Sequence, residues 1–585
     1  MNPWMRNLLC GGGGGGGGAA LPPTGRTMLA NLTSSLILDE GTGGPTWSRA
    51  TKAWGFNELG YLVELASGCA FFGGARLVRN RVVTKSEDFS NAAWGKTNIT
   101  TASVVDVPAK YTTAFSLIPT AVPGQHYISN TAGTPVSTTG TAYIVSVIAK
   151  AFGYSHLFFF TSNAAVYFDL SAGTVGSATG SSVGSTSIIS LGNGWYECRI
   201  RCINLTGTNF EIHSTPSNGV FNYLGDGVSG AKISAVSFVD VTNYDASYVP
   251  EYVSVGVLSA PFHGAGIDGA KYFETDWQGA PIPAANLLGF RREASATNNL
   301  LHSRDLSNAA WSTKTNITAA KTATGLDGIA NTATTLTATA ADAIILQPIT
   351  LASAARCASA YVKRRTGTGT ISFTQDGGGS WTDITSQINS STWSRVQITA
   401  TLANPSVGFK ISTSGDAIDV DCVQNEAGSV ATSPIVTTTA TITRNADSLT
   451  FQTASNIDFA VGTLYCETQI ASSLTSRRAV LVGSDGFSYI NTGDANTVWK
   501  AYDGTNIVIK SGLSDISTGK RKRAIAWGTG LKVTGDGLSP ASGSFDGSFG
   551  SGATIIIGQS INGYVGPVAI YNYQMTDAEL QAITA

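Results

Sequence analysis

The sequence predicts an all-β protein of tandem jelly-roll or β-sandwich modules, preceded by a flexible glycine-rich N-terminal anchor. Charged residues make up only 13% of the 585 residues, which is too few to cover the solvent-exposed faces of many amphipathic helices. Short runs rich in Val, Ile, Thr and Tyr alternate with small polar residues and glycine turns, which is typical of strands. One long phrase occurs twice, which indicates a repeated domain.

The repeated phrase opens each of two related modules. Ser86–Trp94 reads SEDFSNAAW, Ser303–Trp311 reads SRDLSNAAW, and Lys-Thr-Asn-Ile-Thr follows each copy. The copies lie much farther apart than the roughly 20 to 50 residues of a solenoid repeat, so each must open a whole domain. We expect jelly-roll or sandwich modules over 86–250 and 298–443, with the tryptophan of each phrase as a core anchor.

The remaining segments divide the chain further. Residues 1–48 form the predicted anchor, in which eight consecutive glycines at 11–18 serve as a tether or as a backbone threaded through a narrow channel. We expect a junction at 49–85, a linker at 251–297 and a final β sandwich at 444–585.

The final module carries two local signals. Tyr502-Asp-Gly-Thr505 has the chemistry of a hairpin turn. Thr576-Asp-Ala-Glu579 is a capping box, which predicts a short helix at Asp577–Ile583.

Cysteine usage and charge exclude several classes of protein. The seven cysteines are scattered without a CxxC pair, which argues against a disulfide framework or a zinc site. Strand alternation places Cys198 and Cys202 on one apolar face. A net charge of −2 does not indicate the basic surface that binding to nucleic acid or an anionic membrane would need. Since no apolar run reaches about 18 residues and Met1–Cys10 lacks the apolar stretch of a signal peptide, we expect no membrane insertion.

Several phrases carry a resemblance to known proteins. The first set is Ser86–Trp94, Phe168–Val175, Leu191–Tyr196 and Ala431–Asp447. Together these phrases resemble tailed-bacteriophage virion proteins, which string carbohydrate-binding-module-like jelly rolls into tail or head fibres. The final module resembles a concanavalin-A-like, laminin-G-like lectin sandwich through Ala501–Asn506 and Gly563–Asn572.

The resemblance implies a virion structural protein, assembled in the host cytoplasm, that acts as a tail or fibre component. Its distal modules are expected to bind a host-surface polysaccharide or lipopolysaccharide during attachment. It also implies docking on other virion proteins through the N-terminal anchor, and assembly as a homotrimer. A purely structural decoration protein of the capsid or tail is the alternative, and a polysaccharide depolymerase is a second alternative.

The sequence contains no complete catalytic set, so we expect no enzymatic activity. Glycan cleavage by carboxylates needs a pair, and the strand that matches jelly-roll glucanases offers Glu467 alone. Glu274 and Asp276 share a strand face but lie in the linker beside glycine and proline. The five histidines have no metal-binding spacing, and no GxSxG motif is present.

Candidate binding residues are aromatic side chains with polar neighbours, because sugar C–H faces stack on rings while hydroxyls need polar partners. The candidates for glycan contact are Tyr489, Asn491, Tyr502, Asp503, Trp195 and Trp393. Asp416, Asp419 and Asp421 are a candidate set for a structural Ca²⁺, although a solvated strand face is the simpler interpretation. No other cofactor is expected.

Overall fold

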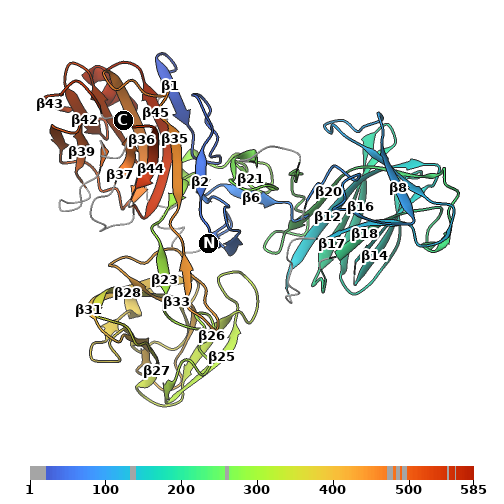
Figure 1. The fold of residues 1–585 in the computed structure, drawn as a ribbon. Coiled ribbons are helices and arrows are strands. Elements are labelled where there is room, and N and C mark those ends of the chain that lie inside the picture. Colours follow the sequence, from blue (N-terminus) through green and yellow to red (C-terminus); the bar gives the residue numbers. More distant parts are fainter. Residues whose placement is uncertain are drawn as a thin grey trace.

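The computed structural model describes residues 21–82, 84–131, 140–161, 163–207, 209–256, 262–470, 478–482, 488–489, 497–549, 552–559 and 561–585. Strands dominate these residues, so the predicted all-β class of sandwich modules is confirmed. Three sandwich bodies surround a small central region (Figure 1). The glycine run and the rest of the predicted anchor up to residue 20 lie outside the described residues.

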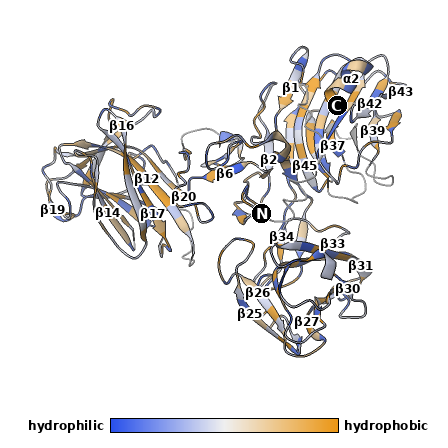
Figure 2. Cartoon of the chain, turned by 180° about the vertical axis from the view of Figure 1, so that it is seen from behind, coloured by the Kyte–Doolittle hydropathy of each residue, from blue (hydrophilic) through white to orange (hydrophobic). Residues whose placement is uncertain are grey.

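The first body, module 1, is a sandwich of two antiparallel six-stranded sheets, the front sheet and the back sheet. The front sheet has the order β15 (Thr174–Thr179), β14 (Ala164–Asp169), β13 (His156–Thr161), β18 (Asn209–Thr215), β11 (Tyr127–Thr131), β7 (Gly95–Thr97). The back sheet has the order β16 (Val183–Gly192), β17 (Trp195–Ile203), β12 (Ala142–Phe152), β20 (Gly230–Asp240), β9 (Phe115–Pro119), β8 (Ile99–Ser103). A short pair, β10 (Pro123–Gly124) with β19 (Tyr223–Leu224), lies at the end of module 1 far from the other bodies (Figure 2).

The second body, module 2, has the same topology with five strands in each sheet. Its front sheet has the order β24 (Thr313–Thr315), β27 (Ala343–Pro348), β32 (Ser406–Ile411), β29 (Ile371–Thr374), β30 (Thr382–Asp383). Its back sheet has the order β25 (Ile317–Ala323), β26 (Ala333–Ala338), β33 (Ala417–Ala427), β28 (Ala354–Thr366), β31 (Ser394–Leu402). A 3₁₀ turn, η3 (Thr385–Gln387), follows β30. One fold is therefore used twice.

The two tryptophans of the repeated phrase occupy equivalent core positions, as predicted. Trp94 and Trp311 are each 1% exposed. The indole N–H of Trp94 donates to the Lys85 carbonyl at 2.9 Å, and that of Trp311 to the His302 carbonyl at 3.4 Å, nine residues upstream in both cases. Both acceptor residues have positive φ angles, 55° and 47°, so even the local turn is repeated.

The third body is the C-terminal sandwich. Its larger sheet has the order β43 (Ala541–Gly543), β42 (Leu531–Gly535), β41 (Arg521–Trp527), β36 (Gly462–Ile470), β45 (Gly563–Tyr571), β22 (Gly289–Arg292), β5 (Phe72–Gly73), with β1 (Arg26–Ala30) also paired to β45. Its other sheets are β2 (Thr46–Ser48), β35 (Ser448–Gln452), β44 (Thr554–Gln559), β37 (Arg478–Val482), and β38 (Ser488–Tyr489), β39 (Trp499–Tyr502), β40 (Ile507–Lys510). The predicted capping box at Thr576 is present and starts helix α2 (Asp577–Thr584).

Strands from distant parts of the chain complete this C-terminal sandwich. β1, β2, β5 and β22 all come from outside 444–585, and Figure 1 shows β1 and β2 beside the strands of that body. Met28, Phe72 and Phe290 are fully buried in the same core as the C-terminal strands. The predicted boundaries at 48 and 444 therefore separate strands that share one core. The physical reason is that β45 would otherwise present an unpaired edge beside exposed apolar side chains.

The central region, called the hub, is built from the segments predicted as junction and linker. It contains the hairpin β3 (Ala53–Phe56) with β4 (Leu62–Leu65) and the pair β6 (Arg76–Arg79) with β21 (Ala270–Phe273). Two 3₁₀ turns, η1 (Phe262–Gly264) and η2 (Ala284–Asn286), lie near β21 and β22. A further pair, β23 (Ala296–Asn298) with β34 (Ile442–Arg444), joins the two ends of module 2.

A buried ionic network fixes module 2 to the hub. Arg444 contacts Asp447 at 3.4 Å and Glu293 at 3.6 Å, and Arg49 reaches Asp447 at 3.3 Å. Arg291 donates to Glu293 at 2.8 Å. Burial raises the pKa of Glu293, but the neighbouring guanidinium groups outweigh it and hold that pKa at about 2. Removing one partner from such a network leaves a buried charge uncompensated.

The six described cysteines are buried and form no disulfide. Cys198 and Cys202 face the core of module 1, as strand alternation predicted. Within the described ranges, no helix combines the length and apolar character needed to cross a membrane.

Candidate functional site

A row of aromatic side chains crosses the outer face of the front sheet of module 1. Tyr127 on β11 lies directly opposite His213 on β18. His213 lies opposite Phe158 on β13, and Phe158 lies opposite Tyr167 on β14. Because directly opposed residues on one sheet face interact as cross-strand pairs, the four rings form one continuous row.

The row faces outward because of the register of β13. Leu157 and Phe159 belong to the core of module 1, so the alternation of a strand sends Phe158 and Phe160 to the opposite face. Solvent-facing strand positions of an antiparallel sandwich usually carry polar side chains. An aromatic row at these positions is therefore a feature that packing of the core does not require.

The rings contact one another closely. The Phe158 and Tyr167 rings stack with centroids 4.3 Å apart, and the His213 ring lies 5.0 Å from Phe158. The Tyr127 ring lies 4.8 Å from His213. Phe158 is only 5% exposed between its neighbours, whereas Phe160 at the end of β13 is 39% exposed. The row thus forms a rigid floor with one accessible ring beside it.

The loop 216–222 forms a wall over one side of this floor. Phe221 projects from it, 43% exposed, with its ring 5.9 Å from Phe158. The Asn218 side chain ties the loop to β15, accepting from the Ser177 amide at 2.9 Å and donating to the Ser177 hydroxyl at 2.8 Å. A Cβ on Gly176 would lie 2.5 Å from the Asn218 side-chain oxygen, so this crossing requires glycine.

Floor and wall enclose a groove of about 410 Å³. Polar groups lie around the rings, and those that line the groove are Gln125, Ser177, Thr179, Glu211 and His213. Rings that accept C–H faces, surrounded by a few amides, hydroxyls and a carboxylate, are the combination that suits a polyhydroxylated ring ligand.

The imidazole of His213 lies between the rings of Tyr127 and Phe158. Its Nε2 hydrogen-bonds Glu211 Oε2 at 2.9 Å, and its Nδ1 is buried without a hydrogen bond to any described residue. Burial lowers the pKa of His213, although Glu211 opposes the shift. The neutral ring is therefore the stable form near pH 7, and it joins the aromatic floor without adding charge.

Module 2 has no such row on its equivalent face. The matching positions on β27, β32 and β29 are Ile344, Lys410 and Ser372, which lie opposite one another. The neighbouring row is Leu346, Gly408 and Thr374. Since the two modules share one topology, the aromatic groove is a specialisation of module 1 and not a property of the fold.

The structure corrects two of the sequence candidates. Trp195 is fully buried, and its indole N–H donates to Asp106 at 3.2 Å. Trp393 packs in a small apolar cluster between the hub and module 2, with the Lys363 ammonium 5.2 Å from its ring. Trp195 is therefore closed to a ligand, whereas Trp393 is partly exposed with one side of its ring packed against this cluster.

The candidates in the C-terminal sandwich stabilise their own hairpin. Asp503 is buried, and its carboxylate accepts from the amides of Thr505, Asn506 and Asp546. The Tyr502 hydroxyl donates to the Gly504 carbonyl. The Tyr489 backbone pairs with Lys500, while its side chain and all of Asn491 lie outside the described residues. The predicted β39–β40 hairpin is confirmed.

The calcium hypothesis is not supported. Each carboxylate of the candidate set pairs with an arginine: Asp416 with Arg364 at 3.5 Å, Asp419 with Arg365 at 3.2 Å, and Asp421 with Arg304 at 2.7 Å. Guanidinium groups already supply the positive charge that a cation would bring. Within the described ranges, no cluster of three His, Cys, Asp or Glu side chains is placed to hold a metal ion.

The carboxylates considered for catalysis are also engaged. Glu467 pairs with Lys520 at 2.8 Å and accepts from the Tyr465 hydroxyl at 2.8 Å. Glu274 accepts from the hydroxyls of Thr33 and Ser34. These contacts give each group a structural role.

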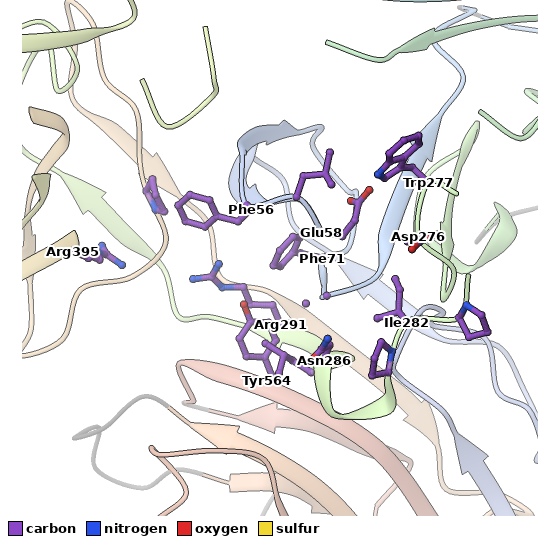
Figure 3. Close-up of a pocket in the computed structure, with 18 of the residues that line it drawn as sticks. Phe56, Glu58, Phe71, Asp276, Trp277, Ile282, Asn286, Arg291, Arg395 and Tyr564 are labelled. Carbon is purple, nitrogen blue, oxygen red and sulfur yellow. The ribbon is translucent and has the colours of Figure 1, made fainter. Parts of the chain in front are cut away.

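A second cavity, of about 330 Å³, lies where the hub, module 2 and the C-terminal sandwich meet (Figure 3). The Arg291 guanidinium lies 5.7 Å from the Phe71 ring and 5.8 Å from the Tyr564 ring. Glu58 accepts from the Tyr244 hydroxyl at 2.7 Å, and burial raises its pKa. Because these groups join different bodies, the cavity is part of the seam that orients them.

Comparisons with known proteins identify no family. No family model matches the chain, and no curated protein matches it. Among solved structures, it is similar to the N-terminal CBM22-1-CBM22-2 tandem domain from Paenibacillus barcinonensis Xyn10C, at 10% identity. That match covers 59% of this chain and 100% of that chain with a TM-score of 0.21. A score this low carries no argument, so function must be inferred from the residues themselves.

The groove residues were missed at the sequence level. The run Phe158–Phe160 has no alternation, so the sequence does not show which rings face outward. A weaker signal was present in β18, where Glu211 and His213 alternate with Phe210 and Ile212. That alternation indicates that one face of β18 points to solvent. The neighbouring strand β13 pairs with β18 and belongs to the same sheet.

Proposed function

We propose that this chain binds carbohydrate in the groove of module 1. The observation that carries the proposal is the groove in which two exposed rings, Phe160 and Phe221, lie beside the outward aromatic row of Tyr127, His213, Phe158 and Tyr167. The row itself is nearly buried, with Tyr167 6%, Phe158 5% and His213 1% exposed. It supports the two exposed rings at the groove, Phe160 and Phe221, whose apolar surface can contact the C–H face of a pyranose unit. The groove crosses four consecutive strands, β15, β14, β13 and β18, and with neighbouring strands about 4.8 Å apart it is about 14 Å across. The groove is therefore suited to a short stretch of a glycan chain.

The proposed activity is binding without turnover. Among the described residues that line the groove, Glu211 is the only carboxylate. Hydrolysis by carboxylates needs two groups about 5 to 9.5 Å apart, one of them acting as an acid. The single carboxylate of Glu211, hydrogen-bonded to His213, is suited to recognising a bound sugar and not to cleaving it.

The finer proposal is that the chain is a tail or fibre component of a bacteriophage, and that the groove holds a host-surface glycan during attachment. Its support is the set of phrases that resemble tailed-bacteriophage virion proteins, together with the tandem sandwich architecture. On this proposal the chain resides in the virion, contacts other virion proteins through its N-terminal segment and assembles as a homotrimer.

Module 2 favours a structural role within the same protein. Its front sheet lacks the aromatic row, and the network around Arg444 and Glu293 clamps it to the hub. A module held rigidly and without the aromatic row is suited to spacing the binding module from the rest of the particle.

The test of glycan binding is an array of bacterial surface glycans probed with the full chain. Phe160→Ala and Phe221→Ala each remove one accessible ring and should weaken binding by about 1 to 2 kcal/mol, roughly 5- to 30-fold. Phe152→Ala is the matched control, because Phe152 is 42% exposed and lies on the back sheet. Loss of affinity in all three variants alike, or in none, would contradict the assignment of the groove.

The virion proposal has a separate test. Gold-labelled antibody against the full chain should mark the tail or fibres of phage particles in electron micrographs. Label on the capsid would favour the decoration alternative, and unlabelled particles would exclude a virion role.

A further inference from the structure

The charges of module 1 are segregated between its two sheets. The described strands of the front sheet contain one lysine and no arginine. The back sheet, in contrast, carries Lys150, Arg199, Arg201 and Lys232. The groove therefore lies on the sheet that is poor in cations.

The single lysine of the front sheet does not serve the groove. Lys96 pairs with Ile128, a core residue, whereas its neighbour Thr97 pairs with Tyr127 of the aromatic row. The Lys96 ammonium donates to the carbonyls of Ser90 and Asn91, both at 3.2 Å. Alternation thus places this cation on the face opposite the groove.

The groove itself carries negative charge. Glu211 lies opposite Phe160, one row from the aromatic floor. Its Oε2 is bonded to His213, and no described group donates to its Oε1. Since His213 is neutral near pH 7, no cation lining the groove balances Glu211.

We infer that the groove selects neutral or amino-bearing glycans and discriminates against glycans that carry carboxylate or phosphate groups. This inference rests on the proposed glycan binding and names its ligand class. An anionic sugar in the groove would lose water beside Glu211 without gaining a counter-charge. A hydroxyl or ammonium group, in contrast, can donate to the open Glu211 oxygen.

Among surface glycans, the inference favours neutral or amino-sugar polymers over acidic capsules and over phosphorylated lipopolysaccharide cores. Like charges at contact distance repel with a free energy of about 1 kcal/mol in water and more in a partly desolvated groove. We therefore expect at least about tenfold weaker binding of an anionic ligand at low ionic strength. Added salt should reduce that ratio because the groove is open to solvent.

The experiment compares one glycan with its own charged form. A neutral glycan that binds the full chain is oxidised at C6 to the carboxylate, and both forms are titrated calorimetrically at low and high salt. The oxidised form should bind about tenfold more weakly or worse, and Glu211→Gln should narrow the ratio of the two affinities. Glu197→Gln, on the back sheet of the same module, is the matched control and should leave the ratio unchanged.

A second probe tests the positive side of the selection. A partly deacetylated chito-oligosaccharide carries ammonium groups and should bind at least as tightly as its acetylated form, with Glu211→Gln removing any gain. Equal or tighter binding of the C6-oxidised glycan, or an unchanged ratio in Glu211→Gln, overturns the selectivity while the glycan-binding proposal stands. Failure of every neutral glycan to bind overturns the proposed function, and the selectivity with it.

Discussion

Replacing Phe290 with alanine should destabilise the C-terminal sandwich and leave module 1 intact. Phe290 lies in the sequence between the two repeated modules, but β22 pairs it with Val565 of β45 and with Phe72 of β5. Its ring is fully buried and contacts Trp47 edge to face, with centroids 5.3 Å apart. Truncation would therefore leave a cavity at the centre of that core.

The expected loss follows from burial. A buried Phe→Ala change costs about 3 to 5 kcal/mol, since both the transfer of the ring and the cavity contribute. For a body of roughly 200 residues, 1 kcal/mol shifts the Tm by about 2 to 4 °C. The transition of the C-terminal sandwich should accordingly move down by roughly 10 °C. Such a loss is a large fraction of the roughly 5 to 15 kcal/mol that stabilises a typical domain.

Calorimetry of the full chain, combined with hydrogen exchange read by mass spectrometry, assigns the effect to a body. Exchange should increase in β36 and β41, while the central strand β12 of module 1 keeps its protection. Phe152→Ala, at an exposed position, is the control and should shift no transition by more than about 1 °C. Unchanged protection of β36 and β41 in Phe290→Ala, or equal loss in β12, would refute the composite core.

Three further predictions follow from the buried contacts. Arg444→Met should lower the free energy of unfolding by about 3 to 5 kcal/mol in urea titrations, because Asp447 and Glu293 lose a buried partner; a loss below 1 kcal/mol would contradict the network. The pKa of His213 is lowered in the folded state, so its contribution to stability is complete above the unfolded pKa of about 6.5 and falls as the pH drops below it. His213→Gln should therefore flatten the decline in the Tm of module 1 between pH 7 and 5, and an unchanged slope would show that His213 does not cause it. The isolated fragment 444–585 lacks four strands of its sandwich and should give no cooperative unfolding transition; a sharp transition by near-UV circular dichroism would show that those strands are dispensable.

The composite C-terminal sandwich illustrates where prediction from sequence reaches its limit. Thr27 on β1 donates to the carbonyl of Ile570, 543 residues away. Nothing local in the N-terminal segment specifies that partner, because strand pairing at such a separation depends on matching faces brought together by folding. Domain boundaries drawn from composition therefore separated β1, β2, β5 and β22 from the core that they complete.

The groove shows the same limit at shorter range. The aromatic run in β13 predicts a strand, but its outward face is set by the register against β14 and β18, and three successive phenylalanines fit either register. Trp195 and Trp393 were better sequence candidates, but Trp195 is fully buried and Trp393 packs partly buried against the cluster between the hub and module 2.

By itself the sequence determined the strand-rich class, the repeat headed by Trp94 and Trp311, the Tyr502 hairpin and the capped helix at the C-terminus. Each of these depends on the intrinsic preferences of residues that are neighbours in the chain. Tertiary structure alone decided which rings of module 1 face solvent, which strands share the C-terminal core and which carboxylates have arginine partners. Those outcomes depend on the register and packing of distant segments, which local preference does not encode.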